Sequence, residues 1–303
     1  MNYGRFCPNP RSLLMTNPFS FAKIQLNGLP TSQLAILLVY WLTNKFAGTG
    51  AAYKMRERRI AVSLSKGGTG KSTTLTSIAH GLALAGYNVL TVDTDTQGQV
   101  AEIFGCQPEY GLAELVAEEV SPEEALFEAR ERLWVLAGGR GLAGTKQLIA
   151  KQEFGSEQVL TRALAPYEGH FDYILVDTSP GWDALTINVL FYVNELVAPV
   201  ALEVLAIRGL VHFENRIKDI QSYHSDLQMR YILPTFLDGR VKKSQEILQQ
   251  LRDHYGTRTC DPIRYNVRLS EAPGYGLSIF EYDPKSSGAA DYAALVERIR
   301  ADE

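Results

Sequence analysis

The sequence has few cysteines and no long hydrophobic run. Its cysteines, Cys7, Cys106 and Cys260, show no metal-binding or redox spacing, and their odd number fits a reducing cytosol better than a disulfide framework. The longest apolar run, LAILLVYWL at residues 34–42, is shorter than the roughly 20 residues that a membrane-spanning helix needs. No A-x-A-like cleavage site follows it. A packed helix is therefore the favoured interpretation of this run, ahead of a signal peptide or an anchor.

The chain also lacks an excess of positive charge. Its formal net charge is −4, which argues against a basic protein that coats DNA but leaves room for a local basic patch. Hydrophobic residues make up 46% and charged residues 21% of the 303 positions. These values are typical of a soluble globular protein, and the length allows one or two domains.

The first part of the chain differs from the rest. Residues 1–57 contain four prolines and the turn-like stretch GTGAA, and they carry none of the motifs found further on. We expect an N-terminal extension over residues 1–57, either a loose segment or upstream sequence translated from an early start codon. A single domain is predicted over residues 58–303.

From residue 58 onward, strand-like runs alternate with helical sequence. Strands are predicted at 59–64, 88–92, 133–137, 171–176, 195–200 and 230–235. Helices are predicted from the phosphate-loop region to about residue 85, and at 111–131, 183–194, 204–225 and 242–255. This alternation indicates an α/β fold, a doubly wound and mostly parallel sheet with helices on both faces. Ligands of such folds bind at the carboxyl ends of the strands.

The stretch SLSKGGTGKSTT, residues 63–74, lies between a predicted strand and a predicted helix. Gly70, Lys71 and Ser72 match the end of the pattern G-x-x-x-x-G-K-[ST], whereas Ser65 stands at its first glycine position. The glycines allow successive backbone N–H groups to point at an anion, and the following helix N-terminus favours phosphate. Lys71 would reach the β- and γ-phosphates, and the Ser72 hydroxyl would bind Mg²⁺. The alternative is a glycine-rich turn with chance lysines.

Two carboxylate motifs follow strand-like runs, TVDTDTQG at residues 91–98 and ILVDTSPG at residues 174–181. Asp177 ends an apolar strand, the usual place for the acid that holds Mg²⁺ directly or through water. Asp93 and Asp95 point the same way if strand geometry persists, and one of them could orient a water on the γ-phosphate. A helix cap is the plainer interpretation for Asp177, and an Asx turn is the plainer one for Asp93 and Asp95.

Together, KGG-x-GKST, DTDTQG and DYILVDTSPG resemble the deviant Walker A ATPases of the ParA/MinD superfamily. The runs LDGR at 237–240, NVRLSEAP at 266–273 and EYDPKSSG at 281–288 resemble the chromosomal ParA/Soj branch. The resemblance covers roughly residues 58–300. Thr96 and Ser179 depart from it, because the family usually has proline at these positions.

The resemblance implies ATP and Mg²⁺ as cofactors and a homodimer that sandwiches ATP. Lys66 matches the signature lysine that reaches the partner's nucleotide, and Asp95 matches the residue that positions the attacking water. Ser72 and Asp177 match the Mg²⁺ positions. The expected nucleotide-binding residues are Lys66, Gly67, Gly68, Thr69, Gly70, Lys71, Ser72, Thr73 and Asn266.

The resemblance also implies non-specific DNA binding through Arg240 and Arg268, and the nearby Lys242 and Lys243 could widen that patch. Only phosphate contacts are expected, without sequence readout. Solvated surface charges are the alternative. The family further implies a weak ATPase that a ParB-like or cargo-adaptor protein stimulates, in the cytoplasm and on the nucleoid, without a membrane partner.

Three rival functions differ in what they require. A ParA-like positioner of a protein complex has the same ATPase site, because a partner protein selects the cargo. A MinD-like membrane-cycling ATPase needs a basic amphipathic C-terminal helix, whereas this sequence is acidic at its last residues, Ala301-Asp302-Glu303. A nitrogenase-like reductase needs paired cysteines in a cluster motif, and Cys106 and Cys260 do not stand in one.

Overall fold

The computed structural model describes residues 57–302. The expected extension over residues 1–57 and the apolar run at 34–42 therefore lie outside the described residues, apart from Glu57. From Glu57 onward the chain forms one compact unit. No helix within residues 57–302 is both long enough and apolar enough to cross a membrane.

Seven strands form one sheet in this unit, in the order β3-β4-β2-β5-β1-β6-β7. All neighbouring strands run parallel except β3 and β4. Every residue of β2, β5 and β6 is buried, as expected for strands covered by helices on both faces. The prediction of a doubly wound, mostly parallel sheet is confirmed. The strands are β1 Arg58–Val62, β2 Val89–Asp93, β3 Leu126–Arg130, β4 Leu133–Leu136, β5 Tyr173–Asp177, β6 Glu195–Ala201 and β7 Gln228–Thr235.

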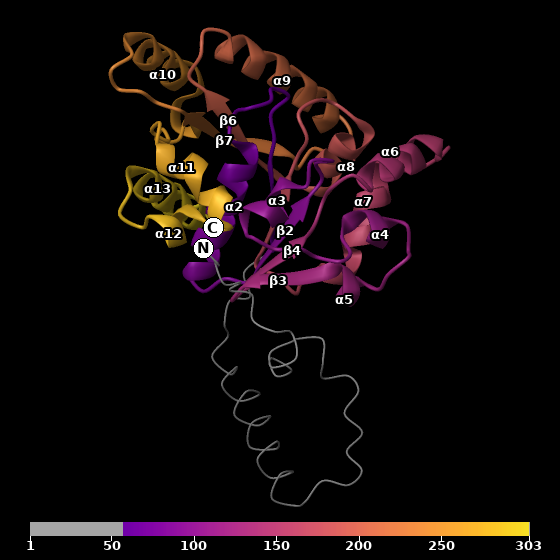
Figure 1. Ribbon diagram of the computed structural model, residues 1–303. Coiled ribbons are helices and arrows are strands. Elements are labelled where there is room, and N and C mark those ends of the chain that lie inside the picture. The colour runs from indigo at the N-terminus through magenta and orange to yellow at the C-terminus, as the bar shows by residue number, and fades with distance from the viewer. Residues whose placement is uncertain (1–56, 303) are drawn as a thin grey trace, which may run out of the picture. The chain divides into compact units, whose positions relative to one another are not determined.

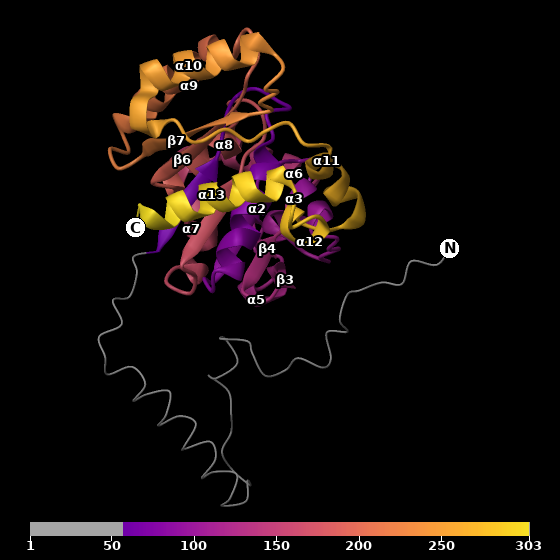
Figure 2. The ribbon, with the colours of Figure 1, turned by 90° about the vertical axis from the view of Figure 1, so that its left-hand side faces the viewer.

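Helices cover both faces of the sheet. The helices α2 (Lys71–Leu84) and α13 (Ser287–Ala301) lie side by side on one face, and α7 (Val159–Leu164) and α8 (Ala184–Tyr192) on the other (Figures 1 and 2). Gly81 lets α13 approach closely, because an added Cβ there would lie 2.6 Å from Val296 Cγ2. The other helices are α3 Gln99–Ile103, α4 Leu112–Val116, α5 Pro122–Ala125, α6 Leu142–Lys151, α9 Ala206–Gln221, α10 Lys242–Tyr255, α11 Val267–Glu271 and α12 Ile279–Tyr282.

The helix predicted over residues 111–131 is wrong in its second half. Residues 126–130 form β3, which pairs antiparallel with β4 through a two-residue turn, Glu131–Arg132. Arg132 adopts a left-handed backbone (φ 61°) in this turn, a conformation that sequence rules assign to Gly or Asn. Pairing with β4 therefore outweighs the helical propensity of this acidic stretch.

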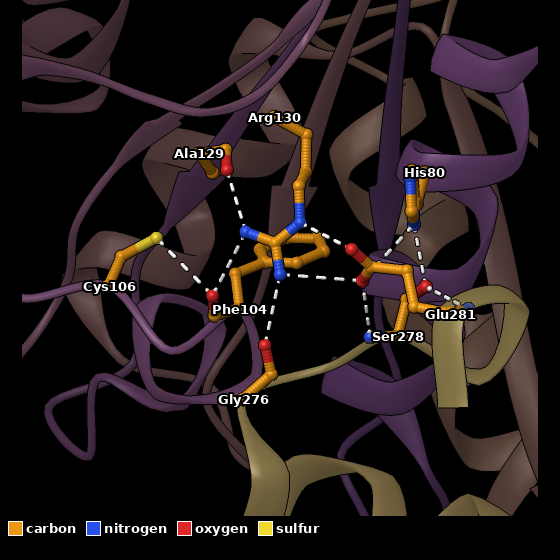
Figure 3. A network of polar contacts seen from close by, with 8 residues as sticks. All are labelled: His80, Phe104, Cys106, Ala129, Arg130, Gly276, Ser278 and Glu281. Atoms are coloured by element: carbon orange, nitrogen blue, oxygen red, sulfur yellow. Dashed lines mark hydrogen bonds and ion pairs between the residues drawn. The ribbon is translucent and has the colours of Figure 1, made fainter. Parts of the chain in front are cut away.

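The edge strand β3 places Arg130 at the centre of a polar network (Figure 3). The Arg130 guanidinium donates to the Glu281 carboxylate (2.6 and 3.3 Å), to Phe104 O (3.2 Å) and to Gly276 O (3.0 Å). His80 of α2 hydrogen-bonds through Nδ1 to Ser278 Oγ at 2.6 Å, at the N-terminus of α12. The network therefore ties the end of α3 and the N-terminus of α12 to β3 and α2.

The register of the sheet places the predicted motifs at one edge. The central strand β5 lies between β1 and β2, and its last residue, Asp177, pairs with Val62 on one side and Asp93 on the other. The glycine-rich loop after β1 and both carboxylate loops therefore leave the sheet next to one another.

Candidate nucleotide site at the carboxyl edge of the sheet

The loop between β1 and α2 has the backbone shape of an anion cradle. Gly68 and Gly70 adopt left-handed conformations (φ 70° and 85°), which residues with a Cβ resist. Gly70 is the N-cap of α2, and no side chain caps the first N–H groups of this 14-residue helix. These N–H groups and the helix dipole therefore favour an anion at the loop. The predicted strand–loop–helix arrangement is present.

Lys71 and Ser72 turn inward from the first turn of α2. The buried Lys71 donates through Nζ to Lys66 O at 3.1 Å. Burial lowers the pKa of Lys71, and the negative charges of Asp177 and Asp95 act in the opposite direction. Ser72 Oγ donates to Asp177 Oδ2 at 2.6 Å. The structure thus brings together the serine and the aspartate that the sequence predicted as Mg²⁺ residues, although they are 105 positions apart.

Two buried oxygens at this site, Asp177 Oδ1 and Thr69 Oγ1, have no hydrogen-bond partner among residues 57–302. Burial, followed by the charge of Asp93, raises the pKa of Asp177 well above its ordinary value, whereas Ser72 and Lys71 lower it. A buried carboxylate oxygen without a partner suits a hard divalent cation, whose preferred ligands are carboxylate and hydroxyl oxygens. The residues present therefore fit Mg²⁺.

The two aspartates of the first carboxylate motif, Asp93 and Asp95, differ in burial. Strand β2 ends at Asp93, so the alternation that would align Asp93 with Asp95 does not continue. The buried Asp93 carboxylate accepts hydrogen bonds from Asp95 N (2.9 Å) and Val100 N (3.0 Å), which is the structural Asx arrangement. Asp95 makes the same contact with the backbone two residues further on, because its Oδ1 accepts from Gln97 N at 3.0 Å. The Asx arrangement is therefore present at both aspartates, but Asp93 is fully buried whereas Asp95 is partly exposed.

Lys66 extends in a different direction from Lys71. Its exposed ammonium forms an ion pair with the Glu203 carboxylate, in the loop between β6 and α9. Sequence reasoning missed Glu203, because one acidic residue after a strand is an ordinary feature. The ammonium of the expected signature lysine is thus held by a residue of its own chain.

The remaining predicted residues lie in the C-terminal part. Asn266 caps α11, because its Oδ1 accepts from Arg268 N at 2.8 Å, and its Nδ2 donates to Ser287 Oγ at 2.9 Å. An isolated parallel bridge between Leu237 and Arg264 joins the segment that precedes Arg240 to the segment that precedes α11. Arg240 and Arg268 thus follow two neighbouring segments.

Both predicted DNA-contacting arginines are exposed and paired with local acids. Arg240 contacts Asp238 at 2.8 Å, and Arg268 contacts Glu271 at 2.8 Å. Solvent-exposed pairs of this kind contribute little, so they cost little to break. The arginines are therefore accessible to phosphate, but their positive charge is partly balanced.

Comparison with known proteins agrees with this geometry. An AAA domain family matches residues 57–229. The chromosome-partitioning ATPase Soj of Thermus thermophilus is 34% identical over 82% of this chain and 97% of its own length. The chromosome partitioning protein ParA of Myxococcus xanthus is 32% identical over 78% of this chain and 86% of its own.

A solved structure with the same fold also matches most of the chain. Cobyrinic acid a,c-diamide synthase of Mycobacterium smegmatis with bound ADP and magnesium superposes with a TM-score of 0.70 at 30% identity. The match covers 80% of this chain and 94% of that one. The domain match, the relatives and the phosphate loop beside Asp177 show that the chain belongs to the ParA/Soj family of P-loop ATPases.

Proposed function

We propose that this protein is a partition ATPase of the ParA type, which binds ATP and Mg²⁺, forms a homodimer in the ATP state and binds DNA without sequence preference. A ParB-like or cargo-adaptor protein stimulates its hydrolysis, and the dimer segregates or positions a DNA cargo on the nucleoid in the cytoplasm. The observation that carries the proposal is the meeting of Lys71, Ser72 and the partnerless oxygen of Asp177 beside the phosphate loop. The named functions of the Soj and ParA relatives support it.

The residues of the nucleotide site have different roles in the proposed hydrolysis. The N–H groups of the loop and Lys71 would hold the β- and γ-phosphates, and Ser72 and Asp177 would hold Mg²⁺. Mg²⁺, when bound, neutralises negative charge on the phosphates. Asp95 orients the attacking water, and Lys66 stabilises charge on the phosphoryl group of the partner's nucleotide. Because these groups orient and neutralise but include no strong general base, basal turnover should be slow.

DNA binding should depend on ATP, because dimerisation pairs two weak basic patches. The second patch then binds as an intramolecular event, which can raise affinity by roughly 10²–10⁴ without any new type of contact. If each protomer neutralises about three phosphates, the logarithm of the binding constant should fall against the logarithm of salt concentration with a slope of roughly −5.

The test is DNA retention with ATP, ADP and no nucleotide, across a salt series. We expect retention only with ATP, and we expect Arg268→Glu to abolish it while ATP-dependent dimerisation remains. Arg162→Glu is the matched control, because Arg162 is an exposed arginine on α7, on the opposite face of the sheet from α2 and α13. Equal retention in all three nucleotide states, or equal loss with both variants, would contradict the proposal.

A further inference from the structure

The segment between β4 and α6 touches the Asp95 loop, backbone against backbone. Gly139 N donates to Asp95 O at 3.0 Å. A Cβ added to Gly138 would lie 2.7 Å from Asp95 O and 2.8 Å from Asp93 Cγ, and a Cβ added to Gly98 would lie 3.2 Å from Gly139 Cα. Separations below 3 Å to backbone and to a buried side chain leave no room for a methyl group. Glycine is therefore required at position 138 if the Asp95 loop keeps its place.

The same segment reaches the second carboxylate loop through one ion pair. Lys146, in α6, places its Nζ 2.5 Å from Asp183 Oδ2. Asp183 Oδ2 also accepts from Ser179 Oγ (3.2 Å), two residues after Asp177, and Asp183 Oδ1 caps α8 by accepting from Thr186 N (2.8 Å). Both charged side chains are mostly buried, with 25% and 32% of their surfaces exposed. The pair therefore fixes the segment that connects Asp177 to α8.

We propose that residues 138–146, which we call the bracket, hold the Asp95 loop and the Asp177 loop in register, with Gly138 and Lys146 as positioning residues for ATP hydrolysis. Gly138 lies against the Asp95 loop and Lys146 pairs with Asp183, so both act through the loops that they contact. The two loops also meet directly, where Thr94 N donates to Asp177 O at 3.1 Å. The bracket contacts each of these loops as well, through Gly139 and Lys146, so the three segments form one frame.

The frame matters because the rate of hydrolysis depends on the alignment of the attacking water with the phosphoryl group. In the proposed mechanism Asp95 would orient the attacking water and Asp177 would hold Mg²⁺, so the separation of the two loops would affect how water and phosphoryl group are aligned. A misplacement of about 1 Å in such a geometry costs on the order of 10²-fold in rate. The inference rests on the proposed function, in which Asp95 orients the attacking water.

The first test replaces Gly138 with alanine in the full chain. We expect kcat for ATP hydrolysis to fall by roughly 10- to 100-fold, whereas KM for ATP and ATP-dependent dimerisation stay within about 2-fold, because the phosphate loop is untouched. Gly209→Ala is the matched control. Gly209 lies in α9, outside the bracket, and an added Cβ there meets no atom within 4 Å.

The second test removes the Lys146 charge and then restores it. Lys146→Met keeps the aliphatic stem, and we expect it to lower kcat with little change in KM. Lys146→Arg retains a donor to Asp183 and should recover most of the rate, a rescue that a loss of packing would not show. Lys218→Met is the control, because Lys218 is an exposed lysine of α9 that lies outside the bracket and the predicted binding residues.

The outcomes separate the bracket from the proposed function. No hydrolysis by the wild type, or full activity of Asp95→Ala, would refute the proposed roles of the site. An active wild type that depends on Asp95, with Gly138→Ala and Lys146→Met both as active as their controls, would overturn the bracket alone. If Gly138→Ala fails to fold, judged by its thermal unfolding, the Lys146 series decides the question by itself.

Discussion

Replacing Glu203 with glutamine should strengthen ATP-dependent dimerisation. The Lys66 ammonium is paired with the Glu203 carboxylate, and in the proposed dimer it would leave that pair to reach the nucleotide of a partner. The two side chains are 44% and 63% exposed, so the pair belongs to the surface class that contributes about 0.2–1 kcal/mol. A symmetric dimer opens two such pairs, at a cost of about 0.4–2 kcal/mol. Glu203→Gln should therefore tighten the dimer by about 2- to 30-fold.

The assay is the dissociation constant of the dimer, measured with a non-hydrolysable ATP analogue at low and high salt. The difference between wild type and variant should shrink with salt, because the Debye length falls from about 8 Å at 0.15 M to about 3 Å at 1 M. In a Lys66→Ala background the Glu203 substitution should have no effect, because no pair remains to be broken. Glu246→Gln, at an exposed glutamate paired with Lys243, controls for the change in net charge.

The reasoning would be refuted by a dimer that Glu203→Gln weakens. That result would mean that Glu203 supports Lys66 in the assembled dimer rather than holding it in the free chain. An equal effect in the Lys66→Ala background would show that Glu203 acts through some other contact.

Two further predictions concern the phosphate loop and α2. Lys71→Ala should weaken ATP binding itself, whereas Lys66→Ala should leave ATP binding by the monomer intact and remove hydrolysis. Nucleotide titration with sizing chromatography distinguishes the two variants, and an equal loss of ATP affinity in both would contradict the proposed role of Lys66 at the partner's nucleotide. Burial lowers the pKa of His80 below its ordinary value of 6.5, so below pH 6.5 the unfolded chain binds more protons and the folded chain loses stability. The free energy of unfolding should fall by up to about 1.4 kcal/mol per pH unit from this group. His80→Gln should flatten that slope in denaturant titrations between pH 7 and 5, and the exposed control His212→Gln should not.

Local patterns predicted the fold and the phosphate loop well. The helix predicted at 242–255 has those bounds in the structure, and the strand predicted at 195–200 is longer by one residue. Both depend on apolar spacing within one element, which a sequence displays directly. Strand β3 was missed because it forms only by pairing with β4 across a two-residue turn. That turn consists of Glu131 and Arg132, which are not residue types typical of a turn.

Site residues could be predicted from the sequence only where a single motif indicated their chemical role. Ser72 and Asp177 were named from separate motifs, and the parallel register of β1 and β5 brings them together. Glu203, Gly138 and Lys146 were not found, because each is singled out only by contacts with residues far away in the chain. A glycine is informative at position 138 only once the backbone beside it is known.

Three of the groups expected to contact ATP and Mg²⁺ have partners within the chain, whereas Asp177 Oδ1 and Thr69 Oγ1 have none among residues 57–302. Lys71 donates to Lys66 O, Ser72 donates to Asp177, and Lys66 pairs with Glu203. Lys71 and Asp177 are already buried, so binding ATP and Mg²⁺ would give new partners to groups that have lost their contact with water. Lys66 differs, because its partner Glu203 lies at the surface and, in the proposed dimer, its new acceptor would lie on a second chain. The proposed function thus assigns nucleotide binding to Lys71 and dimerisation to Lys66, so that one loop would serve two separate steps.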